Sequence, residues 1–240
     1  MVPKALAKMH SKAHAGASAT AGAGLRAKPA GEAAAKRRLK SDSETKCRIM
    51  EEAKALFFRF GFSKVTMDEA ADSLGMSKKT LYRFFPSKED LLLAVTSEHL
   101  DQCNTEINSI LKNKDMDPLE KLKRYVNYIT AIYAKLSEPL MQDFRKHTPE
   151  IWQMVEEHRQ KCLRTDFGFL IKEGRQKGVF RKDVDERLFV LIYSHLLRDI
   201  MNPEVLASLP FKPNQVFDTV SKVIFEGLLT DKARMKYHAQ

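Results

Sequence analysis

The chain has 240 residues, 43% hydrophobic and 30% charged, a length that suits one large or two small domains with a buried core. Its formal net charge is +10, and most of the excess lies in residues 1–43, where six Lys and three Arg accompany one Glu and one Asp. The start lacks the apolar stretch of a secretory signal, and no apolar run approaches the roughly 18 residues that span a bilayer, so a membrane partner is not expected.

Residues 1–43 are predicted to be a disordered, basic, Ala-rich arm. The segment contains 13 Ala and four Gly and has no Phe, Tyr or Trp. It cannot bury enough apolar surface to offset the conformational entropy that folding costs. Its composition fits a solvated tail without a partner, and it fits equally an arm that attracts DNA phosphates at low salt.

The folded part is predicted to begin at residue 44, with a helix that ends at Gly61. Apolar residues recur there at the spacing of one helix face, and glycine is favoured just beyond a helix end. These apolar positions are Ile49, Ala53, Leu56, Phe57 and Phe60.

Two short helices joined by a tight turn are predicted at about residues 67–86. Thr66 and Glu69 have the spacing of a capping box at a helix start, and Gly75 ends that helix. Ser77 caps a second short helix. The apolar side of this second helix consists of Met76, Leu81 and Phe85. The pattern is that of a helix-turn-helix.

The rest of the chain also reads as helix, because strand alternation is absent. Ser87 and Asp90 begin a long helix that runs toward Leu111. Several later helix starts carry a polar residue followed by proline at the first helical position. The later helices are predicted near 118–136, 149–176, 185–201 and 213–229, with a looser piece around 139–146. The predicted fold is all-α, with about nine helices.

The second short helix displays hydrogen-bond donors where a buried helix would carry apolar side chains. Lys78 and Lys79 lie in its first turn, the end that enters the DNA major groove, where lysine reaches guanine acceptors. Tyr82 can donate to a phosphate, and Lys88 can do so beside the free N–H groups of a helix start. The predicted DNA-binding residues are Thr66, Ser77, Lys78, Lys79, Thr80, Tyr82, Arg83 and Lys88.

This motif resembles the DNA-binding signature of TetR/AcrR-type transcriptional regulators over about residues 44–104. The residues that carry the resemblance are Thr66, Gly75, Ser77, Thr80, Leu81, Tyr82, Phe85, Ser87, Lys88, Glu89 and Leu91. It implies a three-helix helix-turn-helix domain over residues 44–104 and a helical effector-binding and dimerisation domain over residues 105–240. It also implies a homodimer, with Tyr82 and Lys88 as phosphate contacts. Lys79 departs from the pattern, because many relatives carry a small residue there.

Two sets of residues in the C-terminal region are candidates for ligand and subunit contacts. Ligand pockets are mostly apolar, which favours a small hydrophobic or amphipathic effector. The candidate effector-binding residues are Tyr133, Phe144, Trp152, Phe167 and His195. Residues 185–201 are apolar nearly all round, which predicts cover on both sides, either by a second subunit in a four-helix bundle or by the subunit's own core. The candidate dimer-interface residues are Phe189, Tyr193, Leu197, Phe217, Val220, Ile224 and Leu228.

The leading interpretation is a cytoplasmic, homodimeric repressor that a small effector releases from a palindromic DNA operator. No catalytic constellation, metal-ligand spacing or cofactor motif is found, so an enzyme, a metal and a cofactor are not expected. An activator or dual regulator of the same fold is an alternative. Another is a helical lipid-binding or enzymatic protein with a nonspecific nucleic-acid tether. A thiol switch would require two of Cys47, Cys103 and Cys162 to approach each other.

Overall fold

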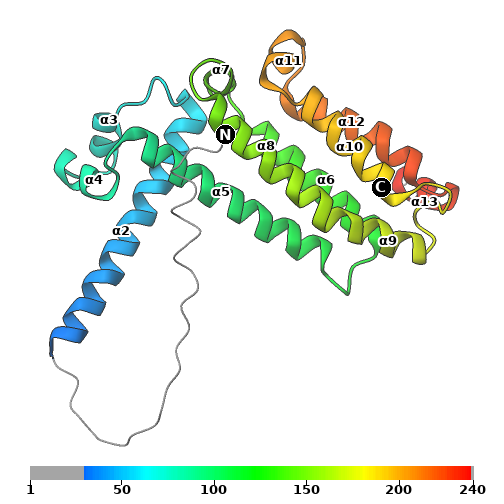
Figure 1. The fold of residues 1–240 in the computed structure, drawn as a ribbon, viewed down its shortest axis with the longest axis horizontal. Coiled ribbons are helices and arrows are strands. Elements are labelled where there is room, and N and C mark those ends of the chain that lie inside the picture. Colours follow the sequence, from blue (N-terminus) through cyan, green and yellow to red (C-terminus); the bar gives the residue numbers. More distant parts are fainter. Residues whose placement is uncertain (1–29, 239–240) are drawn as a thin grey trace, which may run out of the picture. The chain divides into compact units, whose positions relative to one another are not determined.

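The computed structural model describes residues 30–238, in which all regular structure is helical (Figure 1). The helices are α2 (Ala30–Phe60), α3 (Met67–Ser73), α4 (Lys78–Phe84), α5 (Lys88–Leu111), α6 (Pro118–Ala134), α7 (Glu138–Lys146), α8 (Pro149–Cys162), η2 (Leu163–Phe167), α9 (Gly168–Gln176), α10 (Glu186–Ile200), α11 (Pro203–Ser208), α12 (Pro213–Leu228) and α13 (Asp231–His238). The predicted all-α fold is confirmed. The chain divides into two compact units, Met1–Asp42 and Ser43–Gln240.

Helix α2 begins at Ala30, so the prediction of disorder throughout residues 1–43 is wrong for residues 30–43. Residues 30–40 consist mainly of Ala, Glu, Lys, Arg and Leu, which have high helix propensity. Extending an existing helix avoids the cost of a new nucleus, so this segment needs no core of its own to be helical. Residues 1–29, the rest of the predicted arm, lie outside the described residues.

Three successive helix starts in the first half of the second unit carry the predicted side-chain caps. At α3 the Glu69 N–H donates to Thr66 Oγ1 (3.1 Å), and the Thr66 N–H donates to Glu69 Oε2 (2.7 Å). The Oγ atoms of Ser77 and Ser87 each accept from the backbone N–H three residues later, at 3.2 and 3.0 Å. These bonds satisfy N–H groups that a helix start leaves without an intrahelical partner.

The turn between α3 and α4 is fixed by Gly75. Its φ of +60° lies in the left-handed region, where a residue without a Cβ is least strained. The N–H groups of Gly75 and Met76 donate to the carbonyls of Asp72 and Ala71, both at 3.0 Å. These two bonds form the Schellman motif that closes a helix end, so the angle between α3 and α4 is set by local backbone chemistry.

A small core holds α2, α3, α4 and the start of α5 together. Its fully buried members include Ile49, Ala53, Ala71, Leu81 and Leu91, each 0% exposed. Ile151, from the first turn of α8, is also part of this core. The apolar back of α4 is therefore used for packing, and its other side is left to solvent.

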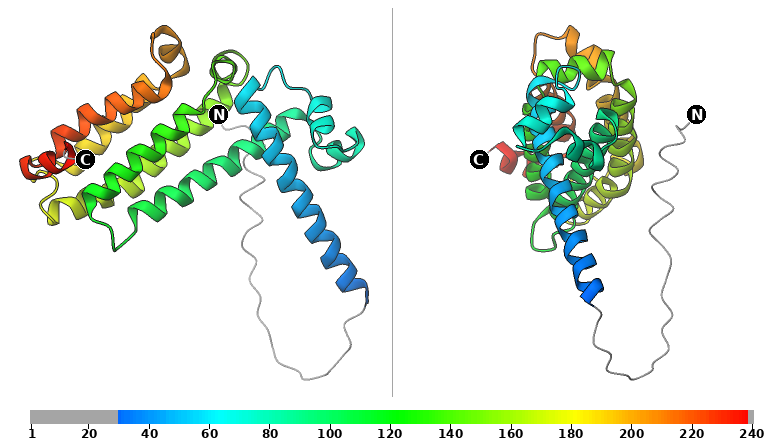
Figure 2. Two further views of the ribbon diagram at one scale, coloured as in Figure 1. Left: turned by 180° about the vertical axis from the view of Figure 1, so that it is seen from behind. Right: turned by 90° about the vertical axis from the view of Figure 1, so that its left-hand side faces the viewer.

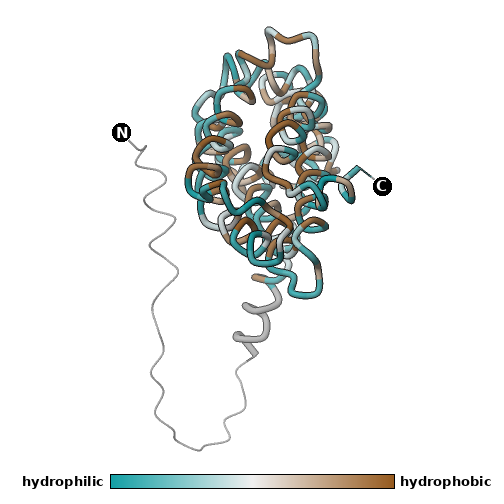
Figure 3. The backbone as a smooth tube through the Cα atoms, turned by 90° about the vertical axis from the view of Figure 1, so that its right-hand side faces the viewer, coloured by the Kyte–Doolittle hydropathy of each residue, from teal (hydrophilic) through white to brown (hydrophobic). Residues whose placement is uncertain are grey.

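The C-terminal helices enclose a second, larger core. Helix α6 packs against α5, α9 and α12, and α12 lies beside α10 (Figures 1 and 2). Hydrophobic and hydrophilic stretches alternate along these helices, as Figure 3 shows. The helix predicted over 149–176 is a continuous run of α8, the π-helical turn η2 and α9.

Two short helices, α11 and α13, were not among the predicted ranges. Helix α11 has six residues, too few for an apolar period, although the Asn202–Pro203 start signal was recognised. Helix α13 is largely polar and buries Ala233, so no hydrophobic period marks it.

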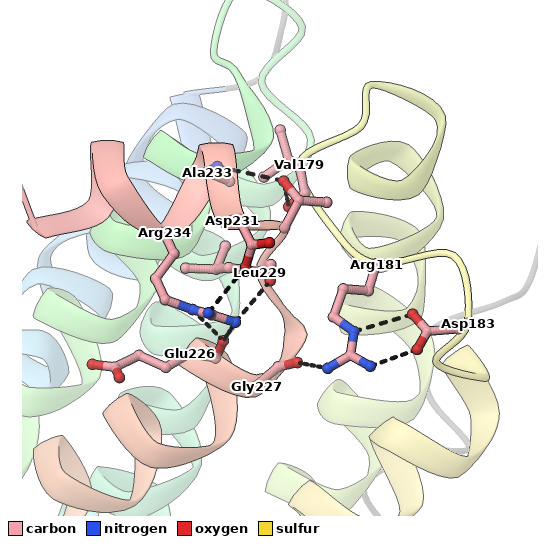
Figure 4. A network of polar contacts seen from close by, with 10 residues as sticks. Val179, Arg181, Asp183, Glu226, Gly227, Leu229, Asp231, Ala233 and Arg234 are labelled. Atoms are coloured by element: carbon pink, nitrogen blue, oxygen red, sulfur yellow. Dashed lines mark hydrogen bonds and ion pairs between the residues drawn. The ribbon is translucent and has the colours of Figure 1, made fainter.

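The loop between α9 and α10 is tied to the junction of α12 and α13 by polar contacts (Figure 4). The Arg181 N–H donates to the Leu228 carbonyl (2.9 Å), and its guanidinium bonds the Gly227 carbonyl (3.2 Å) and Asp183. On the other side, the Arg234 guanidinium donates to the carbonyls that end α12, including that of Leu229 (3.3 Å). The C-terminal end of α12 is thereby held without a glycine cap.

Gly174 and Gly168 give a matched test of packing within one helix. A Cβ on Gly174 would overlap the ring of Phe180, which is 1% exposed, whereas a Cβ on Gly168 would meet no atom within 4 Å. We expect Gly174→Ala to destabilise the protein by about 1–3 kcal/mol, because the buried ring has no space to move. Gly168→Ala should instead stabilise it by roughly 0.5–1 kcal/mol, since alanine loses less backbone entropy. Urea unfolding of both variants measures the difference, and equal effects would contradict the packing argument.

Candidate functional site

The exposed side of α4 carries the predicted donors. Lys78, Lys79 and Arg83 are exposed, and Tyr82 is 46% exposed, whereas Leu81 on the opposite side is fully buried. The ammonium of Lys78 pairs with the Asp68 carboxylate of α3, so one of the two lysines of the first turn is already held by an anion. This pair raises the pKa of Lys78. Lys79, the other lysine of this turn, is exposed.

Thr66 and Lys88 lie on the same half of the protein but are more constrained. The Thr66 hydroxyl is used by the capping box, where it also contacts Glu69 Oε2 (2.9 Å). The Lys88 ammonium rests over the Phe62 ring, 4.2 Å from its centroid, and donates to the Ser63 carbonyl (3.4 Å). Burial lowers the pKa of Lys88. Both residues therefore connect the start of a helix to the loop between α2 and α3.

An apolar cavity of about 160 Å³ lies among α2, α5, α6, α7 and α8, with further lining residues from η2, α10 and α12. Four of the five predicted effector-binding residues line it: Tyr133, Phe144, Trp152 and Phe167. The fifth, His195, is exposed on α10 and does not line this cavity. The reason is rotational: His195 lies on the outward side of α10, and the inward side is taken by Tyr193, Ser194 and Leu197.

A few polar groups interrupt the apolar lining. Arg159 of α8 donates from Nη1 to the Tyr133 hydroxyl (2.7 Å), and its guanidinium pairs with the Glu156 carboxylate. Among the described residues, Arg159 Nε and His158 Nε2 are buried without a hydrogen-bond partner. Burial lowers the pKa of His158, so its imidazole is neutral at pH 7. Sequence reasoning missed both residues, because a helix with apolar, basic and acidic residues intermixed gives no clear inward face.

Helix α5 supplies a wall of the cavity that was also not predicted. Leu92, Val95, His99 and Cys103 lie on this wall at helical spacing, whereas the sequence analysis predicted a helix here without assigning it a role in the pocket. His99 and Cys103 also line a more open groove among α2, α5 and α6. Burial, with the nearby charges of Lys54 and Lys135, lowers the pKa of His99 to about 4. Burial raises the pKa of the Cys103 thiol, which disfavours the reactive thiolate.

Helix α7 joins the cavity to the loop that precedes the helix-turn-helix. Asp143 is 1% exposed, and its Oδ2 accepts from the Ser63 N–H (3.0 Å). Gly61, with φ of +83°, lies so close that a Cβ would stand 2.6 Å from the same oxygen and 3.0 Å from Pro139. The next residue of α7, Phe144, packs on Trp152 with ring centroids 5.5 Å apart and contacts both cores. One turn of α7 therefore contacts the cavity on one side and, on the other, the loop before α3 and the small core that holds α4.

The predicted dimer-interface residues are mostly buried within one subunit. Phe189, Tyr193, Leu197, Phe217 and Leu228 are between 0% and 7% exposed, so as surface contacts these five are wrong; Val220 and Ile224 are half-buried. The exposed apolar residues of α10 are those on its other side, Leu188, Leu191 and Ile192, at 50–54% exposure. Val223 of α12 is exposed as well, at 69%. We call Leu188, Leu191, Ile192 and Val223 the outer apolar stripe.

Within residues 30–238 no group of three or more His, Cys, Asp or Glu side chains is arranged to hold a metal ion. In the same part of the chain, no helix has both the length and the hydropathy needed to cross a bilayer. Within the same described range, Cys47, Cys103 and Cys162 are not joined by disulfides.

Comparison with known proteins yields matches over both halves of the chain. Residues 49–95 match a family model described as bacterial regulatory proteins, tetR family. The chain is 25% identical over 185 residues to the HTH-type transcriptional regulator YvaF of Bacillus subtilis (strain 168), covering 77% of this chain and 96% of the relative.

Two solved structures share the fold over most of their length. A transcriptional regulator from Cytophaga hutchinsonii ATCC 33406 is 26% identical with a TM-score of 0.60, covering 76% of this chain and 97% of that one. A protein from Saccharomonospora viridis, described as a transcriptional regulator in complex with choline, is 23% identical with a TM-score of 0.60, covering 78% and 99%. These relatives are transcriptional regulators and not enzymes.

Proposed function

We propose that this protein is a homodimeric repressor, which a small hydrophobic or amphipathic effector releases from a palindromic operator. The proposal starts from two findings: the chain belongs to the TetR family of transcriptional regulators, and it has a helix-turn-helix DNA-binding domain. The observation that carries the proposal is the two-sided character of α4. Its apolar back is locked into the small core, and its lysines, hydroxyls and Tyr82 are accessible. Such a helix presents donors to base edges and phosphates while its own position is fixed. The proposal places the protein in the cytoplasm, with the chromosome.

Lys79 is the residue of α4 whose substitution tests base reading most directly. The charge of Lys78 is paired with the Asp68 carboxylate, whereas Lys79 is exposed at the end of the helix that enters the groove. We expect Lys79→Ala to weaken operator binding by ~1–3 kcal/mol if the side chain reads a base. Binding of the full-length protein to an operator selected from genomic fragments, measured at several salt concentrations, checks this.

The control is Lys232→Ala, which removes the same charge from exposed α13. It should leave operator affinity nearly unchanged. Equal loss of affinity for operator and unrelated DNA in Lys79→Ala, with a salt slope smaller by about one, would instead identify a phosphate contact. No loss on either DNA would contradict a role of α4 in recognition.

The outer apolar stripe supports the proposed dimer. Four large apolar side chains at or above half exposure on two adjacent helices are unusual for a monomer surface and mark an association site. Two helices from each subunit would then form a four-helix bundle related by a two-fold axis. A dimer is also what a palindromic operator requires, because two α4 helices must reach major grooves about 34–36 Å apart or a multiple of this distance.

We expect Leu191→Glu to weaken dimerisation roughly tenfold or more, because an unpaired carboxylate would be buried between the subunits. Its exposure in the isolated subunit, 52%, means that the fold itself should tolerate the change. Phe211→Glu is the matched control, since Phe211 is 58% exposed but lies in the loop before α12, off the stripe. Sedimentation equilibrium measures both variants. Equal dimerisation of Leu191→Glu and wild type would exclude the stripe as the interface.

The cavity and α7 support a route by which an effector acts on α2, α3 and α4, which we call the DNA-reading half. The Saccharomonospora viridis structure holds choline in a protein of the same fold, so a small molecule fits this architecture. In this chain, a ligand that displaces Phe144 also moves Asp143, and with it the loop at Gly61 and Ser63. The ligand needs only a higher affinity for one position of α7 to shift the separation of the two α4 helices.

Asp143→Ala tests whether this contact positions the DNA-reading half. The change removes the acceptor of the Ser63 N–H without touching any residue on α4. We expect operator affinity to fall several-fold, because a less fixed loop must be ordered on binding. Asp143→Asn keeps a side-chain oxygen at the same place and should retain most of the affinity. Gln142→Ala, an exposed neighbour on α7, serves as the control. Unaltered operator affinity in Asp143→Ala, with a folded protein by circular dichroism, would contradict the coupling.

A further inference from the structure

Resting on the proposed effector site, we infer the chemical class of its ligand. We propose that the cavity binds a small, uncharged, ring-sized molecule whose hydroxyl or carbonyl oxygen hydrogen-bonds the unpaired nitrogens of Arg159 and His158. This polar oxygen is not specified by the apolar lining, nor by the family to which the helix-turn-helix motif is similar. It follows from three properties of the cavity, namely its orphaned nitrogens, its charge balance and its size.

The orphaned nitrogens are the first property. Buried polar atoms in native proteins nearly always have a hydrogen-bond partner, because leaving one unpaired costs about 1–3 kcal/mol. Arg159 Nε and His158 Nε2 have none among the described residues, although the other groups of Arg159 are paired with Tyr133 and Glu156. Both residues line the cavity, and they are neighbours on α8. A ligand oxygen that reaches them would satisfy atoms that the protein leaves without a partner.

Charge balance is the second property. Arg159 is the one residue of the described lining with a permanent charge, and Glu156 already neutralises it. Gln160 Nε2 also donates to Glu156 (2.7 Å), so the carboxylate is itself well satisfied. A carboxylate ligand would therefore enter an apolar site with no spare cation, and an ammonium ligand would approach a guanidinium. Both would lose hydration without a partner charge, which disfavours them relative to an uncharged oxygen.

Size is the third property. The cavity volume of about 160 Å³ is close to that of protein cavities of roughly 150 Å³ that bind benzene. A six-membered ring with one oxygen substituent matches this space. Trp152, the chain's single tryptophan, lines the same cavity and packs on Phe144, so its fluorescence reports occupancy directly.

The test uses four cyclohexyl probes that differ only in the head group. Cyclohexanol, cyclohexane, cyclohexanecarboxylate and cyclohexylammonium are each titrated into the full-length protein, with Trp152 fluorescence and melting temperature as readouts. We expect cyclohexanol to bind at least about tenfold more tightly than either charged probe. Tighter binding of the carboxylate or of the ammonium, or no binding of cyclohexanol, would overturn the inference.

Variants then separate the hydrogen bonds from the apolar contacts. Arg159→Lys keeps a cation for Glu156 but lacks the Nε donor, and His158→Phe keeps the ring shape but lacks Nε2. Each should weaken cyclohexanol about tenfold, the equivalent of one buried hydrogen bond, and change cyclohexane less than twofold. Arg164→Lys makes the same exchange at a residue that does not line the cavity, and should change neither. Equal changes for both probes would assign Arg159 and His158 a purely structural role and overturn the inference.

Operator binding is also measured for the same variants without any probe. This measurement distinguishes a failure of the inferred ligand class from a failure of the proposed function. Arg164→Lys lies outside both α4 and the cavity and should bind the operator as the wild type does. A protein that selects no operator at all would refute the proposed function whatever the probes do. A protein that binds its operator but shows no head-group discrimination would refute the ligand class alone.

Discussion

The arrangement of the molecule depends on the burial of Asp143. A carboxylate with 1% exposure loses most of its hydration, and that loss is tolerated when its oxygens accept good hydrogen bonds. Its partner is the Ser63 N–H, which belongs to the loop between α2 and α3. The loop can approach because Gly61 has no Cβ and adopts a positive φ. Asp143 and Gly61 thus join the two cores, and neither residue can be replaced without disturbing this contact.

Phe144 and Ile151 extend this junction with apolar contacts. Phe144 packs against both cores, and Ile151 of α8 is a member of the core that holds α4. Cores are close-packed, so a change of volume at the cavity is not absorbed locally but displaces whole helices. A cavity beside α7 is for this reason well placed to alter the DNA-reading half, and a cavity elsewhere among the C-terminal helices would not be.

Interactions between neighbouring residues were enough to predict most helix boundaries in the first half of the protein. Capping residues, Gly61 and Gly75 and the apolar back of α4 are effects of neighbouring residues, and the structure has the helix starts of α3, α4 and α5 where these signals predict them. The N-terminal limit of α2 was misjudged, because a low apolar content was taken as evidence against helix. Propensity alone continues a helix that packing has already started.

The sequence by itself determined the all-α class, the helix-turn-helix with its exposed donors and the helix starts with their caps, since all of these follow from residues within a few positions of one another. Only the tertiary structure decided which side of α10 faces inward, because a helix that is apolar all round carries no sign of its own rotation. It also decided that Asp143 is buried, and that Arg159 and His158 are half-buried, beside apolar groups from distant helices. Burial of a polar residue depends on partners far away in the chain, and no local pattern records them.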